Sequence, residues 1–258
     1  MEKKSIHIVI TFIIIPSLIT AIHYDKVDLT FTFDLNTNDQ SFVLGTHTKL
    51  PQEDVEIPLD RLIAYPYIVD VSGYVWSDAN FQLEIHHLME IEHKKGEIPE
   101  NSAIIMYTGW CLKYRNLDKY FGSNNLSNTS QYHHPGIHSE AITWLSAKRK
   151  ISSILSDTPS IDAGQTTDFP SQSILHSENI PFFLNVDLTS YERIKRMKKP
   201  LLIALPAQIQ NGSRIVPTRI VVMETTNILV SSDGYLFVFG VIFLTLVFHF
   251  VSKLLIGY

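Results

Sequence analysis

The sequence predicts an α/β fold, and two observations support this class. Short apolar runs typical of buried strands, such as residues 103–107 and 201–205, alternate along the chain with segments in which apolar residues recur at helical spacing, such as residues 81–93 and 139–150. Strands that alternate with helices are characteristic of α/β domains. With 258 residues, of which 45% are hydrophobic, the chain can also bury one substantial core.

Local patterns predict the individual elements. Alternating or continuous apolar residues predict strands over residues 27–33, 67–71, 103–107, 151–155, 201–205 and 215–223. Helical spacing predicts helices over residues 81–93, 139–150 and 191–199. Gly96 is a stop signal after the first helix, and Ser139 is the expected cap of the second. Residues 122–131 are rich in Ser and Asn, which predicts an exposed loop.

Both ends of the chain differ from this domain, which we expect to span residues 22–230. Residues 1–21 combine two lysines, a short apolar stretch and small residues at its end, as a cleaved secretory signal peptide does. Residues 235–258 contain no acidic residue and could cross ~30 Å of hydrocarbon as a helix. This segment predicts a C-terminal hydrophobic anchor, either a transmembrane helix or a GPI-attachment signal. The domain would then be luminal or extracellular, on the cell surface or an endomembrane.

The sequons predict glycosylation, the net charge bears on the expected partners, and the single cysteine bears on disulfide formation. Asn125, Asn128 and Asn211 each begin an N-x-[ST] triplet, which predicts glycosylation in a luminal protein. The net charge of −5 gives no electrostatic reason to expect nucleic acid as a partner, whereas the C-terminal segment predicts a membrane. Cys111 is the single cysteine and cannot form an internal disulfide, and its apolar context predicts a buried, unreactive thiol.

Several short motifs follow one another between residues 27 and 223. They are, in chain order, Val27–Asp34, Gly45–His47, Gly96–Pro99, Thr108–Trp110, His133–Ile137, Asp157–Asp162 and Asp168–Pro170. This ordered set resembles the cyclase and bacterial-type kynurenine formamidase family. The resemblance implies a single α/β domain of the swivelling β/β/α type, commonly a homodimer or homotetramer. It also implies hydrolysis of amide bonds, with N-formylkynurenine as the best-known substrate and zinc or manganese activating the attacking water.

Most residues of the implied metal site are changed in this chain. The family's first metal motif reads H-x-G-T-H-x-D-x-P-x-H, and a histidine and a glutamate follow later in the family's sequences. Aligned on the shared motifs, the ligand positions of this chain carry Val43, His47, Lys49, Gln172 and Leu184, and the position of the general acid/base carries Glu53. His47 is therefore the only ligand that the resemblance retains.

These changes bear directly on function. A bound divalent ion normally takes at least three protein ligands. A Lys49 ammonium about 4 Å from such an ion would cost roughly 8 kcal/mol at an effective dielectric constant of about 20. We therefore expect no metal cofactor and assign no catalytic residue. The expected function is that of a non-catalytic protein that binds a small-molecule ligand or a partner.

Two other functions stay open. One is a divergent zinc- or manganese-dependent amide hydrolase, and the other is a purely structural membrane subunit. His86 and Glu90 are four residues apart on a predicted helix, which can hold a metal, although a solvated helix face explains the pair as well. His134 and His138 are expected to be polar loop residues. The family match at residues 157–162 implies a structural turn near the pocket, not a serine hydrolase.

Overall fold

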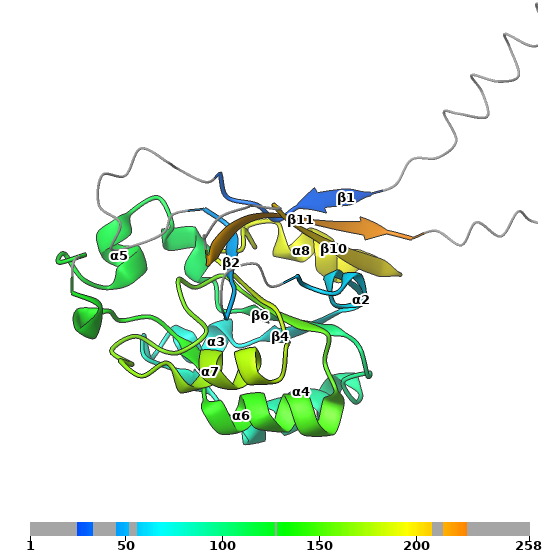
Figure 1. The fold of residues 1–258 in the computed structure, drawn as a ribbon, viewed down its shortest axis with the longest axis horizontal. Helices are drawn as coiled ribbons and strands as arrows, with labels where there is room; N and C mark the ends of the chain where they lie inside the picture. Colours follow the sequence, from blue (N-terminus) through cyan, green and yellow to red (C-terminus); the bar gives the residue numbers. More distant parts are fainter. Residues whose placement is uncertain (1–24, 33–44, 52–55, 127, 208–213, 226–258) are drawn as a thin grey trace, which may run out of the picture. The chain divides into compact units, whose positions relative to one another are not determined.

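The computed structural model describes residues 25–32, 45–51, 56–126, 128–207 and 214–225 (Figure 1). Several predictions concern residues outside these ranges, namely the signal peptide, the hydrophobic anchor, Val43, Glu53 and Asn211. In the ranges that are described, no helix is long and apolar enough to cross a membrane.

Nine strands of the described residues form one mixed sheet. In spatial order the main path runs β3-β10-β11-β2-β9-β8-β6-β4, and β1 pairs with β11 beside it. The strands are β1 (Lys26–Asp28), β2 (His47–Lys49), β3 (Ile63–Ala64), β4 (Pro66–Asp70), β6 (Ala103–Tyr107), β8 (Ser153–Ser156), β9 (Phe182–Leu184), β10 (Pro200–Pro206) and β11 (Ile215–Glu224).

The sheet has a parallel half and an antiparallel half that meet at β2. Strands β4, β6, β8 and β9 pair in parallel, whereas β2, β11, β10 and β3 pair antiparallel to their neighbours. The two ends of the path, β3 and β4, are separated in sequence by Tyr65 alone, so the sheet is nearly closed. Strand β2 therefore holds its residues at the junction of the two halves.

The helices cover the two sides of this sheet. They are α2 (Leu59–Leu62), α3 (Ser72–Val75), α4 (Ile85–Lys95), α5 (Leu117–Phe121), α6 (Ser139–Trp144), α7 (Pro170–Ser177) and α8 (Tyr191–Arg196). Helices α3, α4, α6 and α7 gather on one side of β4 and β6, and α8 lies on the other, near β10 (Figure 1). A small parallel sheet joins β5 (Gln82–Leu83) to β7 (Gly136–Ile137).

Strand β6 explains why a continuous apolar run was a reliable strand signal. Ile104 and Met106 pack into one hydrophobic cluster, whereas Ala103 and Ile105 pack into another, and all four are fully buried. Side chains alternate between the two faces of a strand, so a central strand covered on both faces needs apolar residues at every position. The α/β class and the strand at residues 103–107 are confirmed.

All three helix predictions need correction at an end, and the helix predicted over residues 191–199 ends at Arg196. The helix predicted from residue 81 begins at Ile85, because residues 82–83 pair with residues 136–137 as a strand. The helix predicted over residues 139–150 is capped by His138, whose ring accepts a hydrogen bond from the backbone N–H of Glu140, so Ser139 is not its cap. Its last turn, Leu145–Arg149, widens to a π-helix.

Candidate functional site

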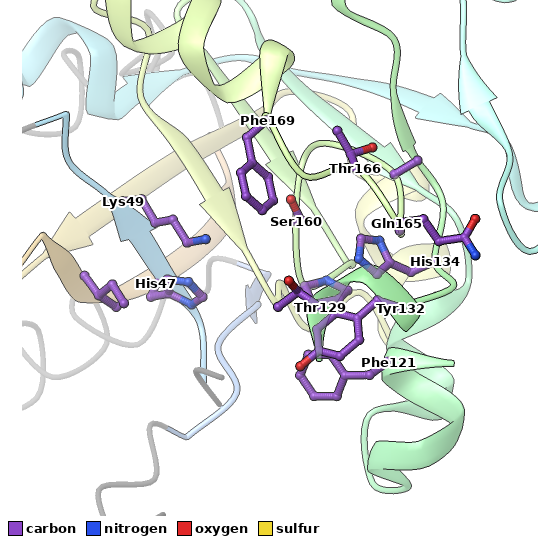
Figure 2. Close-up of a pocket in the computed structure, with 14 residues that line it drawn as sticks. His47, Lys49, Phe121, Thr129, Tyr132, His134, Ser160, Gln165, Thr166 and Phe169 are labelled. Atoms are coloured by element: carbon purple, nitrogen blue, oxygen red, sulfur yellow. The ribbon is translucent and has the colours of Figure 1, made fainter. Parts of the chain in front are cut away.

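A cavity of about 160 Å³ opens beside β2. His47 and Lys49 line it from β2, and two loops complete the wall, one containing Tyr132 and His134 and the other Ser160 and Phe169 (Figure 2). Both predicted positions on β2 thus lie at one cavity, as the motif alignment implies. Both loops follow strands of the parallel half, the first after β6 and α5 and the second after β8.

His47 is held as a neutral imidazole with a free nitrogen. Its Nδ1 lies 3.0 Å from the carbonyl oxygen of Gly45, which also accepts a hydrogen bond from the side-chain amide of Asn185. A carbonyl can only accept, so Nδ1 carries the proton and Nε2 presents a lone pair. Nε2 is buried and has no hydrogen-bond partner in the described part of the chain. Burial lowers the pKa of His47 from 6.5 to about 4.

His134 has the same protonation pattern on the opposite loop. Its Nδ1 lies 3.2 Å from the carbonyl oxygen of Pro135, and the side chain is 3% exposed. Burial lowers its pKa to about 4, so the ring is neutral with its proton on Nδ1. His134 lies in a loop, as predicted, but it is buried and forms part of the cavity wall. Only the packing of its loop against residues 160–164 decides this.

Two glycines permit that close packing. A Cβ atom on Gly136 would lie 2.2 Å from the backbone nitrogen of Ala163, and one on Gly164 would lie 2.3 Å from the carbonyl oxygen of Tyr132. Such contacts exclude any side chain at either position. With glycine there, the N–H of Gly164 donates to the carbonyl oxygen of His134 at 2.9 Å. The two loops are therefore joined backbone to backbone along the cavity wall.

Lys49 brings a positive charge into the cavity. Its amine points into the space between the two loops (Figure 2) and has no hydrogen-bond or ion-pair partner among the described residues. Burial lowers the pKa of Lys49, and the carboxylate of Asp162 opposes this effect. The ammonium in turn contributes to the low pKa values of His47 and His134, because a nearby positive charge disfavours an imidazolium.

The side-chain amide of Gln172 supports the cavity wall. Its side-chain nitrogen donates to Ser160 Oγ at 2.9 Å and to Asp162 Oδ2 at 3.1 Å. Asp162 also accepts from the backbone N–H groups of Ser171 and Gln172 in the first turn of α7. The carboxylate is thus occupied as a helix cap. The structural turn expected at residues 157–162 is confirmed by these contacts.

Phe169 closes the cavity from a strained position. It precedes a proline and has φ 48° and ψ 54°, a left-handed conformation that non-glycine residues rarely adopt. Its carbonyl oxygen accepts hydrogen bonds from the backbone and the hydroxyl of Ser173, which hold this conformation. The ring, 37% exposed, lies over the cavity (Figure 2). Strain of this kind gathers at binding sites.

Among the described residues, the cavity lining lacks the set of ligands that the family resemblance implies for a divalent ion. Across the residues that the structure describes, no three His, Cys, Asp or Glu side chains are grouped so that they could hold a metal. Leu184 pairs with His47 across β9 and β2 and is fully buried in the apolar core, so it offers no ligand. Lys49 brings a cation to the cavity instead of a carboxylate.

The remaining sequence candidates lie elsewhere. On α4, His86 pairs with Glu84, and Glu90 pairs with Lys94, so the two do not form a site. Cys111 is buried, and burial beside Asp157 raises the pKa of its thiol, as an unreactive cysteine requires.

Two of the three glycosylation candidates fall within described residues. Asn125 is exposed, and Asn128 accepts hydrogen bonds from the backbone and the hydroxyl of Ser130. Both lie in the loop predicted over residues 122–131, which contains a short 3₁₀ turn at Thr129–Gln131. Glycosylation at these positions stays a prediction.

Comparison with known proteins gives a matching family model and a matching relative of known name. The family model described as Cyclase matches residues 22–163, more than half of the chain, and this match ends before Gln172 and Leu184. Isatin hydrolase of Roseibium aggregatum is 30% identical over 165 residues, which are 61% of this chain. The aligned region spans 58% of that relative, which is less than two thirds of its length.

Solved structures share the fold. Isatin hydrolase A from Ralstonia solanacearum superposes with a TM-score of 0.65 at 19% identity, over 82% of this chain and 97% of that one. A protein from Bacillus stearothermophilus described as a predicted metal-dependent hydrolase superposes with a TM-score of 0.50 at 12% identity, over 79% of this chain and 100% of that one. The chain thus shares the fold of these proteins, and it belongs to the Cyclase family.

Proposed function

We propose that this chain is a non-catalytic member of its family that binds a small organic molecule without a divalent metal. The observation that carries the proposal is the replacement of a ligand set by one buried imidazole and one ammonium, His47 and Lys49, at the same cavity. A metal needs three or more donor side chains, and the described residues offer no such group. The cavity nonetheless keeps polar groups that converge on an enclosed space, as binding sites do.

Metal content and turnover test this proposal together. The full-length chain is purified in detergent, and bound zinc and manganese are measured by mass spectrometry. Hydrolysis of isatin and of N-formylkynurenine is then followed with and without added zinc or manganese. We expect far less than one metal ion per chain and no turnover above the buffer rate. One bound ion per chain, with turnover that His47→Ala abolishes, would contradict the proposal.

A metal-dependent amide hydrolase is the second candidate, and one observation favours it. The Nε2 atom of His47 is buried without a hydrogen-bond partner in the described residues, and a bound ion is one of the groups that can satisfy such an atom. The names of the isatin hydrolase relatives support the same chemistry. The matched control for His47→Ala is His93→Ala, which changes an exposed histidine of α4 and should leave metal content and turnover unchanged.

We also propose that the protein is a glycosylated, membrane-anchored component of the secretory pathway. The apolar segment at residues 235–258 and the sequons at Asn125, Asn128 and Asn211 support this location. Glycan removal by an N-glycosidase should increase the gel mobility of the chain. Release from cells by a phosphatidylinositol-specific phospholipase would identify a GPI anchor, and retention would identify a transmembrane helix. Light scattering of the purified protein would distinguish a monomer from the proposed homodimer or homotetramer.

A further inference from the structure

We propose that the ammonium of Lys49 serves as the built-in cation of the cavity, and that it binds the carboxylate of a small aromatic acid. This inference rests on the proposed metal-free function and names the ligand class of the same site. It depends on three features of the described residues: a positive charge without a direct partner, a second donor that lines the same cavity, and a cavity the size of one aromatic ring.

Among the residues that the structure describes, the charge of Lys49 has no direct counter-ion. The nearby carboxylate is that of Asp162, but its two oxygens accept hydrogen bonds from the backbone of Ser171 and from the backbone and side chain of Gln172. No ion pair joins it to Lys49. A cation on the wall of a partly enclosed cavity is stabilised when an anion approaches it, because water solvates it poorly there. A carboxylate would supply both that charge and two acceptor oxygens.

Ser160 supplies a second donor. Its Oγ accepts a hydrogen bond from the side-chain nitrogen of Gln172 at 2.9 Å, which leaves the hydroxyl hydrogen free to point elsewhere. Ser160 lines the same cavity as Lys49 (Figure 2). One ligand carboxylate could therefore accept from the ammonium and from the hydroxyl. Gln172 acts as a positioning residue for this donor.

The imidazoles of His47 and His134 add hydrogen-bond acceptors, which favour a ligand that carries a hydrogen-bond donor besides its carboxylate. His47 and His134 both carry their proton on Nδ1, so each offers an Nε2 lone pair. Nε2 of His47 is buried and has no partner among the described residues. A hydroxyl group on the ligand can satisfy it, whereas a purely apolar ligand would leave it unsatisfied. The site therefore favours an acid that also carries a hydrogen-bond donor.

The walls and volume favour an aromatic body. Phe121, Tyr132 and Phe169 contribute rings to the lining, and the cavity measures about 160 Å³. A cavity of about 150 Å³ holds one benzene-sized ring. Aromatic rings that meet edge to face or with an offset attract each other beyond their buried area. A single-ring acid thus matches the charge, the donors and the space together.

Binding of benzoate and of benzamide, its neutral counterpart of the same shape, tests the inference. Both are titrated calorimetrically into the full-length protein in detergent, with a chelator present to remove divalent metals. We expect benzoate to bind at least about tenfold more tightly than benzamide, because its bond to the ammonium is charge-assisted. At least one of the three hydroxybenzoates should bind more tightly than benzoate.

Variants assign the effect to Lys49. Lys49→Met substitutes an unbranched side chain that is one atom shorter and removes the charge, so benzoate affinity should fall about tenfold while the weak binding of benzamide persists. Lys119→Met, which changes an exposed lysine on α5, is the matched control and should leave both affinities unchanged. Ser160→Ala retains the charge and should weaken benzoate severalfold, which keeps the test valid if Lys49→Met does not fold.

The outcomes separate this inference from the proposed function. Equal affinities for benzoate and benzamide, the absence of benzoate binding, or full affinity in Lys49→Met would each overturn the carboxylate assignment and leave metal-free binding of another ligand intact. Benzoate binding that requires added zinc or manganese, together with one bound ion per chain, would overturn the metal-free function itself.

Discussion

The buried neutral His134 makes the stability of the domain depend on pH in a calculable way. Its pKa is about 4 in the folded chain and 6.5 when exposed. Below pH 6.5 the unfolded chain therefore binds a proton that the folded chain does not, so stability falls as the pH falls. At 1.36 kcal/mol per pH unit, the difference amounts to about 3 kcal/mol below pH 4, of which about 2 kcal/mol is already lost at pH 5.

Comparison of wild type with His134→Asn measures this contribution. Asparagine can keep a donor near the carbonyl oxygen of Pro135 but does not titrate. The variant should therefore not show the pH-dependent loss of stability that His134 causes. His47, which is shifted in the same direction, is present in both proteins and cancels. The assay is urea unfolding of the full-length protein in detergent, followed by tryptophan fluorescence at pH 7, 6 and 5.

The expected result is that the difference in unfolding free energy between wild type and His134→Asn changes with pH. Relative to His134→Asn, wild type should lose about 2 kcal/mol of unfolding free energy between pH 7 and pH 5. His93→Asn, at an exposed position on α4, is the control and should follow wild type. A difference between wild type and His134→Asn that stays constant over this range would refute the assignment of a buried neutral imidazole at this wall of the cavity.

Two further substitutions test the packing around the site. Gly136→Ala should destabilise the domain by about 3 kcal/mol in urea unfolding, because the new methyl group meets the backbone of the facing loop, whereas Gly73→Ala, with no atom within 4 Å, should not. Glu92→Gln should cost about 2 kcal/mol, because it weakens a two-point contact to the largely buried Arg149 (2.6 and 2.8 Å). Glu100→Gln removes an exposed pair and should change stability by less than about 0.5 kcal/mol. Comparable losses for Glu92→Gln and Glu100→Gln would contradict the importance of burial.

Local sequence patterns predicted the elements that are specified by residues within one short segment. The strand at residues 103–107 is buried on both faces, so every residue had to be apolar and the run was unambiguous. The helix ends were less certain, because pairing between residues 82–83 and 136–137 and the ring of His138 decide them. The strand pairing joins segments more than fifty residues apart, which local patterns cannot bring together, whereas the His138 cap lies two residues from Glu140 and depends on a side-chain conformation that residue type alone does not specify.

The sequence by itself predicted, through the family resemblance, that His47 is the one retained ligand position, and it placed the positive charge of Lys49 two residues further on, because residue types at ordered motifs can be read directly. Only the tertiary structure decided that His134 is a cavity wall and that Gln172 holds Ser160 and a helix cap. The physical reason is that burial and hydrogen-bond partners come from segments distant in sequence. Whether a polar residue is solvated or enclosed depends on what packs against it.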